Sequence, residues 1–322
     1  MDSLINGIFS ISDENTFQSC AMEVYNYQSH HNPVYKKFIE QLNRAKPRNI
    51  YEIPFLPISF YKTHEVRCFH NEIDIQFRSS GTGGHRSNHF VESLALYERS
   101  FETCYRSQIG NPEDQIIIAL LPNYLEQDAS SLIYMVDFLI KKSNTDLSGY
   151  YLNDYSKIIE VYNQAKINEK KVVIFGVSYA LLDLAENKLN LSQAIIIETG
   201  GMKGKRKEIT KEQLHKKLTS GFNVSFIASE YGMSELLSQC YSDKNGLFTN
   251  PPWMKVLIRD TYDPLSYINQ GKTGGINIID LANVYSCSFI STQDLGKSVE
   301  NKFQLMGRYD NSDIRGCNLL IE

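Results

Sequence analysis

The sequence predicts an α/β protein with parallel-rich sheets covered by helices and a smaller β region toward the C-terminal end. Along the middle of the chain, short apolar runs alternate with longer segments of helical periodicity, which is typical of βαβ units. The runs are continuously apolar, as expected of strands buried on both faces. After residue 246, short strands separated by turn residues replace this rhythm and indicate a more antiparallel region.

Three segments follow from this pattern. Residues 1–50 are expected to form a helical segment packed on the body, since apolar positions between residues 13 and 45 recur at helical spacing. Residues 51–246 are expected to be an α/β nucleotide-binding body that begins with extended chain at Ile53–Ile58, because proline disfavours helix at the residue before it. Residues 247–322 are expected to be a β-rich subdomain with a short tail.

The body has a predicted order of strands and helices. Its strands are expected at Ile73–Phe77, Ile116–Leu121, Val172–Phe175, Ala194–Ile197 and Val224–Ala228. Helical periodicity marks Phe90–Arg106, Ser130–Lys141, Tyr155–Ala165 and Lys211–Leu218. The β-rich subdomain has expected strands at Val256–Ile258, Gly275–Ile279 and Cys287–Ile290.

Composition excludes several classes of protein. The 322 residues are 42% hydrophobic and 22% charged, which is ordinary for a soluble globular protein. A formal net charge of −4 gives no reason to expect nucleic-acid binding. The six cysteines include no CxxC pair, so neither a zinc site nor a disulfide framework is predicted. The start resembles no signal peptide and no apolar run could span a bilayer, so a cytoplasmic protein is expected.

A glycine-rich loop is the first segment that indicates chemistry. It consists of Ser79, Ser80, Gly81, Thr82, Gly83 and Gly84, between a predicted strand and a helix expected to begin near Asn88. Small residues let the backbone approach a phosphate, and a helix N-terminus would favour the same anion. The loop lacks both the Walker and the GxGxxG patterns, so an ordinary connecting loop is an alternative.

Further segments carry charged residues where a cleft could form. Tyr231-Gly232-Met233-Ser234-Glu235 follows a predicted strand, at whose carboxyl end ligands commonly bind. Ser291–Gly296 places Asp294 in a predicted turn, and Gly307–Asp310 contains Arg308. Each segment has a structural alternative: a carboxylate at a helix start for Glu235, a turn brace for Asp294, and a surface ion pair for Arg308.

In this order, these four segments resemble the motifs of the adenylate-forming superfamily of acyl-CoA synthetases, aryl-CoA ligases and firefly-type luciferases. A closer resemblance is to the acyl-protein synthetases of bacterial luminescence operons. The segments that carry the closer resemblance are 53–57, 121–126, 130–135 and 199–204. Together with the four motifs they extend from about residue 50 to the end of the chain.

The resemblance implies ATP and Mg²⁺ as cofactors and assigns roles at the site. The loop from Ser79 to Gly84 would bind the triphosphate, and Glu235 would hold Mg²⁺, a hard cation suited to oxygen ligands. Asp294 would accept hydrogen bonds from the ribose, and Arg308 would contact ribose or phosphate. The residues expected to flank the adenine are Gly200, Gly201, Tyr231 and Gly232.

The resemblance also implies a reaction. A carboxylic acid, expected to be a long-chain fatty acid, would become an acyl-adenylate and then an acyl group on Cys317, before transfer to a partner such as an acyl reductase. A thiolate is a good nucleophile toward such a mixed anhydride. Alternatively, Cys317 is a small buried apolar residue. The small C-terminal lid domain of the larger superfamily is expected to be absent, as it is in acyl-protein synthetases.

Two other functions stay open on the sequence. One is a ligase of the phenylacetate-CoA ligase kind that transfers the acyl group to CoA or a carrier protein. The other is a nucleotide-binding partner subunit without catalysis. His85 and His89, just after the glycine-rich loop, could contact the acyl carboxylate or simply begin a helix.

Overall fold

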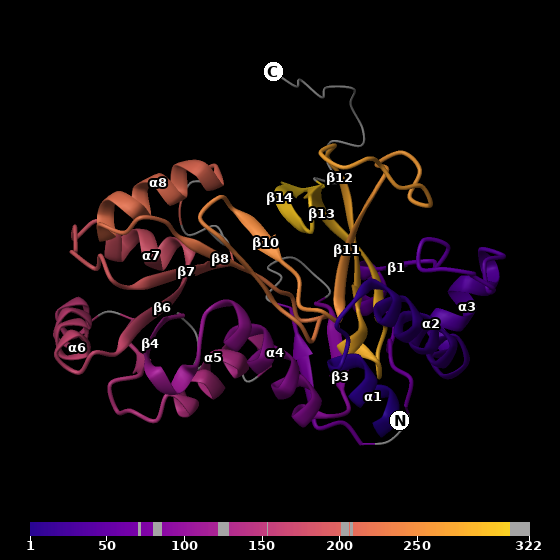
Figure 1. Cartoon of the computed structure of the whole chain (residues 1–322), viewed down its shortest axis with the longest axis horizontal. Helices are drawn as coiled ribbons and strands as arrows, with labels where there is room; N and C mark the ends of the chain where they lie inside the picture. Colours follow the sequence, from indigo (N-terminus) through magenta and orange to yellow (C-terminus); the bar gives the residue numbers. More distant parts are fainter. Residues whose placement is uncertain are drawn as a thin grey trace. The chain divides into compact units, whose positions relative to one another are not determined.

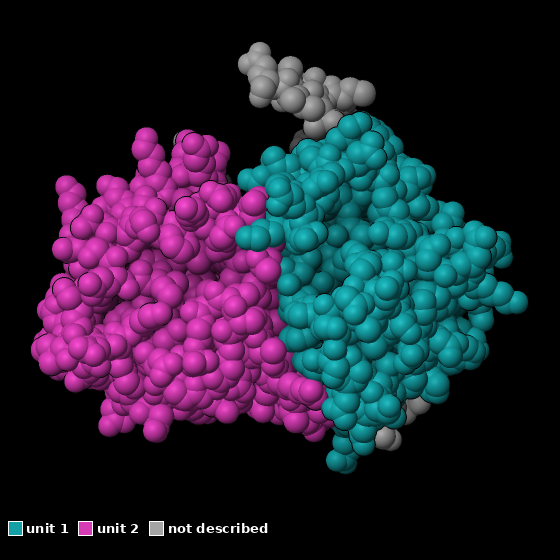
Figure 2. All heavy atoms as spheres, viewed as in Figure 1, with its two compact units in different colours: residues 1–72, 250–322 teal, residues 73–249 magenta. Residues whose placement is uncertain are grey.

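The computed structural model describes residues 1–69, 72–79, 86–121, 129–152, 154–200, 206 and 209–309 (Figure 1). The chain divides into two compact units, one of residues 1–72 with 250–322 and one of residues 73–249. Figure 2 colours the two units teal and magenta, respectively. The N-terminal helical segment therefore belongs to the same unit as the β-rich segment that begins near residue 250.

The contiguous unit is built on a sheet that is parallel at its centre. The parallel strands, in spatial order, are β8 (Ala228–Tyr231), β7 (Ile195–Thr199), β6 (Lys171–Val177), β4 (Gln115–Leu120) and the short β5 (Gly149–Tyr150). On the other side of β8, β9 (Cys240–Ser242) and β10 (Leu247–Thr249) are antiparallel. The predicted parallel sheet is confirmed, although β8 begins four residues later than the sequence predicts.

Helices cover both faces of this sheet. α6 (Tyr155–Ile167), α7 (Ser178–Ala185) and α8 (Lys211–Phe222) pack on one face, in a core that includes Ile174 and Ile196. α4 (Leu94–Gln108) and α5 (Ser131–Lys142) lie on the other, where the Tyr105 ring stacks on Phe175 with centroids 6.1 Å apart. Since successive side chains of a strand point to opposite faces, Glu198 faces α8 whereas Thr199 faces α4.

A hairpin precedes α4 and occupies the place where the sequence predicts the start of that helix. β2 (Ile75–Arg78) and β3 (Asn88–Val91) are antiparallel, and the glycine-rich segment connects them. The prediction of a helix beginning near Asn88 is wrong. His89 and Val91 are buried while their neighbours are half-buried, which is the two-residue period of a strand. α4 begins only at Leu94, where the Ser93 side chain caps it by accepting from the Leu96 N–H.

The other unit contains an antiparallel sheet. Its strands are β11 (Met254–Arg259), β12 (Gly274–Asp280), β13 (Phe289–Val299) and β14 (Lys302–Arg308), and β1 (Leu56–Pro57) pairs in parallel with β13. The sequence predicted the antiparallel region but placed Asp294 in a turn. That prediction is wrong, because β13 continues through Asp294 and pairs it with Arg308 of β14. Short 3₁₀ helices, η1 (Ile58–Lys62) and η3 (Leu281–Asn283), complete the unit.

The N-terminal segment of this unit forms α1 (Asp2–Phe9), α2 (Glu14–His31) and α3 (Pro33–Gln41). Helix α2 ends at His31 because Pro33 starts a new helix, capped by the Asn32 side chain. The buried Gln28 amide joins α2 to a distant segment: its Nε2 donates to the carbonyls of Asn283 and Val284, at 3.0 and 2.9 Å. Its Oε1 accepts from the Ser288 N–H at 2.9 Å. The helical segment is thus tied to the sheet of its unit.

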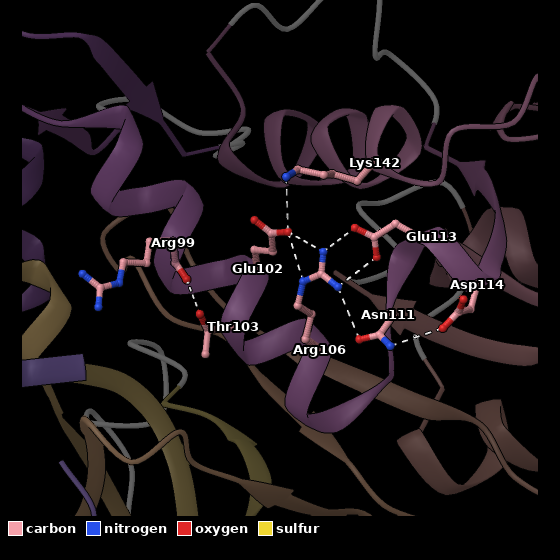
Figure 3. A network of polar contacts seen from close by, with 8 residues as sticks. All are labelled: Arg99, Glu102, Thr103, Arg106, Asn111, Glu113, Asp114 and Lys142. Carbon is pink, nitrogen blue, oxygen red and sulfur yellow. Dashed lines mark hydrogen bonds and ion pairs between the residues drawn. The ribbon is translucent and has the colours of Figure 1, made fainter. Parts of the chain in front are cut away.

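A network of charged side chains connects α4 to η2 (Pro112–Asp114) and α5 (Figure 3). The Arg106 guanidinium donates to Glu102 at 2.7 Å and to Glu113 at 2.5 Å. Lys142 approaches Glu102 from α5 at 3.5 Å. The hydrogen bond from Arg106 lowers the pKa of Glu113 to about 2. The network therefore stabilises the packing of α4 near the start of β4.

Replacing Glu113 with glutamine is expected to lower the free energy of unfolding by about 1 kcal/mol at pH 7, the upper range for a partly exposed ion pair. Because the folded-state pKa of Glu113 is below its usual value, its contribution is complete above about pH 4.5 and is lost as pH falls toward 2. Urea unfolding at pH 7, 4.5 and 3.5 would measure this. A difference between wild type and variant that stays constant down to pH 3.5 would contradict the assignment.

No helix in the described part of the chain is long and apolar enough to cross a membrane.

Candidate functional site

Two loops leave the carboxyl ends of neighbouring parallel strands. β7 ends at Thr199 and is followed by Gly200, and β8 ends at Tyr231 and is followed by Gly232. The strands pair in the register Glu198 with Ser229, so both loops emerge at the same edge of the sheet. Ligands of open α/β sheets bind at this edge.

The first loop begins with a backbone angle that favours glycine, and an aromatic side chain anchors the second loop. Gly200 has a φ of 69°, in the left-handed region where glycine is favoured. The Tyr231 ring is buried and packs edge-on against Phe248, with centroids 5.9 Å apart. The Tyr231 side chain thus anchors its loop to β10, and the backbone beyond it is positioned by that packing.

A carboxyl group lies between the loops on the α4 face. The Thr199 hydroxyl donates to Oε2 of Glu230 at 2.6 Å. On the other side, a Cβ atom on Gly232 would clash with Oε1 of the same carboxyl. Burial raises the pKa of Glu230 to about 7, and the nearby Glu198 carboxylate acts in the same direction. The Thr199 hydrogen bond and Lys211 oppose this shift, because they favour the ionised form.

A second buried carboxylate, Glu198, lies on the opposite face of the same strands. It accepts hydrogen bonds from Ser178 at 2.7 Å and from Ser229 at 3.1 Å. Lys211 and His215 of α8 approach it at 4.0 and 3.9 Å. Burial opposes its ionisation, but these contacts outweigh burial and lower the pKa of Glu198 below its usual value. The Glu198 carboxylate and its hydrogen bonds therefore stabilise the end of β7.

The Glu235 turn is joined to the hairpin that carries the glycine-rich segment. Glu235 is buried, and its Oε2 accepts from the Ser234 hydroxyl at 2.8 Å. The carbonyl of Ser234 accepts from Nδ1 of His89 on β3 at 2.7 Å. His89 is 1% exposed, so its place is in the core beneath the turn rather than in an open cleft. The histidine thus fixes Glu235 relative to β3.

The base of the glycine-rich segment is closed by a pair of serines. Two hydrogen bonds join Ser79 and Ser87. The Ser87 N–H donates to the Ser79 hydroxyl at 3.0 Å, and the Ser79 N–H donates to the Ser87 carbonyl at 3.1 Å. Because His89 is two residues beyond Ser87, the loop base and the Glu235 turn belong to one connected cluster. The predicted phosphate residues Ser80, Gly81, Thr82, Gly83 and Gly84 lie outside the described residues.

The remaining predicted residues belong to the other unit or cannot be placed. Asp294 on β13 is buried and accepts from Nε of Arg308 at 2.9 Å, while the Arg308 side chain is 76% exposed. The structure therefore pairs these two residues within their own unit. Gly201 and Cys317 lie outside the described part of the chain.

Sequence reasoning missed two buried charged residues, Glu198 and Arg259, and the half-buried Glu230. Glu198 and Glu230 lie on β7 and β8, which lead into the predicted adenine-flanking loops, and Arg259 lies on β11. Arg259 donates to the carbonyls of Ile276 and Thr292, both at 2.7 Å, and so holds β13 just before Asp294. One signal was present for Glu198, which follows the apolar run Ile195–Ile197, where burial of a charge without a partner is costly.

Within the described residues, no group of three or more His, Cys, Asp or Glu side chains could hold a metal ion. A magnesium ion at Glu235 would consequently take its other ligands from nucleotide oxygens and water, which is common for Mg²⁺. The carboxylate of Glu235 is a hard oxygen donor and fits that role.

Comparison with known proteins identifies the family of this chain and structures that share its fold. Residues 9–322 match the family described as acyl-protein synthetase, LuxE. No curated protein matches the chain.

The solved structures that are similar share the fold at low sequence identity. ATP-bound MatB from Rhodopseudomonas palustris has a TM-score of 0.54 and 15% identity, covering 74% of this chain and 49% of its own. The 2-hydroxyisobutyryl-CoA ligase in complex with 2-HIB-AMP and CoA has a TM-score of 0.64 and 10% identity, covering 96% and 68%. The chain spans about half the length of MatB. The predicted α/β fold of adenylate-forming enzymes is confirmed.

Proposed function

Because the chain belongs to the acyl-protein synthetase family LuxE, we propose that it activates a carboxylic acid with ATP and then transfers the acyl group to a thiol. In the first step a carboxylate oxygen attacks the α-phosphorus of ATP, giving acyl-adenylate and pyrophosphate. In the second step a thiolate attacks the acyl carbon, forming a thioester and releasing AMP. The acid is a long-chain fatty acid, and the final acceptor is a partner protein such as an acyl reductase.

The observation that carries this proposal is the connected cluster at the carboxyl end of the sheet. It consists of two hydrogen-bonded groups that β3 connects: His89 with the Glu235 turn, and the two serines at the base of the glycine-rich loop. Both substrates are anionic, so their reaction needs charge neutralisation and fixed orientation. Such a cluster provides a rigid frame for a triphosphate and a divalent cation.

We assign the roles accordingly. The loop from Ser79 to Gly84 binds the triphosphate, and Glu235 holds Mg²⁺, which would neutralise charge on the phosphates. The adenine lies between the backbones that follow β7 and β8, and Asp294 with Arg308 binds the ribose and its phosphate. Cys317 is the thiol that receives the acyl group. The adenine-flanking residues are Gly200, Gly201, Tyr231 and Gly232.

The test is ATP–pyrophosphate exchange measured with a panel of carboxylic acids, including fatty acids of several chain lengths. Exchange that requires both an acid and Mg²⁺ would support acid activation, and the preferred acid would define the substrate class. ATP binding without exchange for any acid would contradict the enzymatic proposal and favour a non-catalytic subunit. Efficient acyl transfer to free CoA, with no acylation of the protein itself, would instead favour a CoA ligase.

A further inference from the structure

Glu230 occupies a position that none of the proposed roles uses. It lies at the end of β8, immediately before Tyr231, with its side chain on the face of the sheet that α4 covers. A carboxyl group here is unexpected, because this face is filled by aromatic residues such as Tyr97 and Phe175. Glu230 is half-buried, and specific polar contacts offset the cost of removing part of its carboxyl from water.

Those contacts connect both adenine-flanking loops. Oε2 of Glu230 accepts from the hydroxyl of Thr199, the residue before Gly200. Oε1 lies so close to Gly232 that a Cβ atom there would overlap it. Through its hydrogen bond with Thr199, this carboxyl group therefore links the ends of two neighbouring strands at the edge where both loops leave the sheet. Thr199 is 3% exposed, so water cannot readily replace this hydrogen bond.

On the opposite face of the sheet, Ser178 makes a second contact that holds the loop beginning at Gly200. The Ser178 hydroxyl contacts both Glu198 and the carbonyl of Gly200, at 2.7 and 3.2 Å. Glu198 on β7 and Lys211 on α8 also act electrostatically on Glu230, as Glu230 does on Tyr97 of α4 and Tyr241 of β9. The first loop is thus held from both faces, and Glu230 is the group that ties it to the second loop.

We propose that Glu230 is a positioning residue for the nucleotide, which fixes the spacing of the Thr199–Gly200 and Tyr231–Gly232 backbones and so sets the affinity for ATP. This inference rests on the proposed function, because it takes the adenine to lie between these loops. Glu230 acts through its hydrogen bond with Thr199 rather than by contact with the reacting atoms. Its loss should therefore weaken ATP binding and leave the chemical step nearly unchanged.

The experiment compares Thr199→Val, Glu230→Ala, their double variant and Glu230→Gln. Thr199→Val and Glu230→Ala should each raise the KM for ATP about tenfold, as expected for one partly buried hydrogen bond to a carboxyl group. The turnover number and the KM for the acid should stay within about twofold. The double variant should be no weaker than the single variants, because both remove the same interaction. Glu230→Gln keeps an acceptor for Thr199 and should retain a KM for ATP within about twofold of wild type.

The control is Ser143→Ala, which also removes a buried hydroxyl from this unit. Ser143 donates to Ser148 at 2.7 Å beside the amino-terminal half of β4, away from the ligand edge. The KM of the Ser143→Ala variant for ATP should equal the wild-type value. If Glu230→Ala fails to fold, Thr199→Val carries the test, since valine has the shape of threonine.

Calorimetric titration with ATP, without acid, separates the two proposals. Wild type that binds ATP but exchanges no pyrophosphate would refute the proposed reaction, while a tenfold weaker dissociation constant in Thr199→Val would still support positioning by Glu230. Wild-type affinity for ATP in both Thr199→Val and Glu230→Ala would overturn the positioning role. A fall in turnover number equal to the rise in KM would overturn it as well. Absence of ATP binding by wild type would overturn both proposals.

Discussion

Replacing Glu235 with glutamine is expected to lower the rate of acid-dependent pyrophosphate exchange by about a hundredfold, because the variant loses the negative charge that holds Mg²⁺. Glutamine has nearly the same size and can still accept the Ser234 hydrogen bond, so the turn should keep its shape. The measurement is exchange rate against Mg²⁺ concentration. High Mg²⁺ should restore part of the lost rate, which a folding defect would not allow.

The matched control is Glu113→Gln, the same change at a carboxylate in the Arg106 network. Its exchange rate should stay within about twofold of wild type at 25 °C. A Glu235→Gln variant with the wild-type rate and the wild-type Mg²⁺ dependence would remove this residue from the metal site. The triphosphate assignment would then rest on the glycine-rich loop, without a residue for the metal ion.

Replacing Cys317 with serine is expected to abolish acylation of the protein by a radiolabelled acid and ATP. Serine is a far weaker nucleophile than a thiolate toward an acyl-adenylate. Pyrophosphate exchange, which precedes transfer, should stay within about twofold. Gel analysis with and without hydroxylamine, which cleaves thioesters, would measure the label.

Cys20→Ser is the control for that experiment, because Cys20 is partly exposed and lies in the N-terminal helical segment. It should be labelled like wild type. Label that persists in Cys317→Ser would show that another group carries the acyl chain. Loss of both label and exchange would indicate instead that the substitution disrupts the site for acid activation.

The central sheet could be predicted because its strands are apolar on both faces. Ile116, Ile117 and Ile118 are all buried, so the continuous apolar run alone identifies β4. The start of β8 could not be predicted in the same way. Val224 and Phe226 continue the apolar pattern but lie before the strand, where Phe226 is exposed. Pairing with β7, which the local pattern does not encode, decides where β8 begins.

The sequence motifs predict the residues of the candidate site, but the local structure predicted for two of these segments is wrong. Asp294 is on a strand rather than in a turn, because pairing with Arg308 extends β13 through a segment rich in polar and glycine residues. His89 is on a strand because hairpin pairing outweighs local helical spacing. Glu198 and Glu230 were missed since their roles arise from Ser178, Thr199 and α8, which are distant in sequence and meet only in the folded unit.

The buried Gln28 amide has a consequence for synthesis of the protein. Its acceptors at Asn283 and Val284 emerge from the ribosome about 255 residues later than Gln28 itself. At a translation rate of about 5–20 residues per second, the N-terminal helices wait roughly 10–50 s for their partners. During that interval the contiguous unit, residues 73–249, can complete its own folding. The discontinuous unit therefore closes last, and the apolar faces of its N-terminal helices stay uncovered until the end of synthesis.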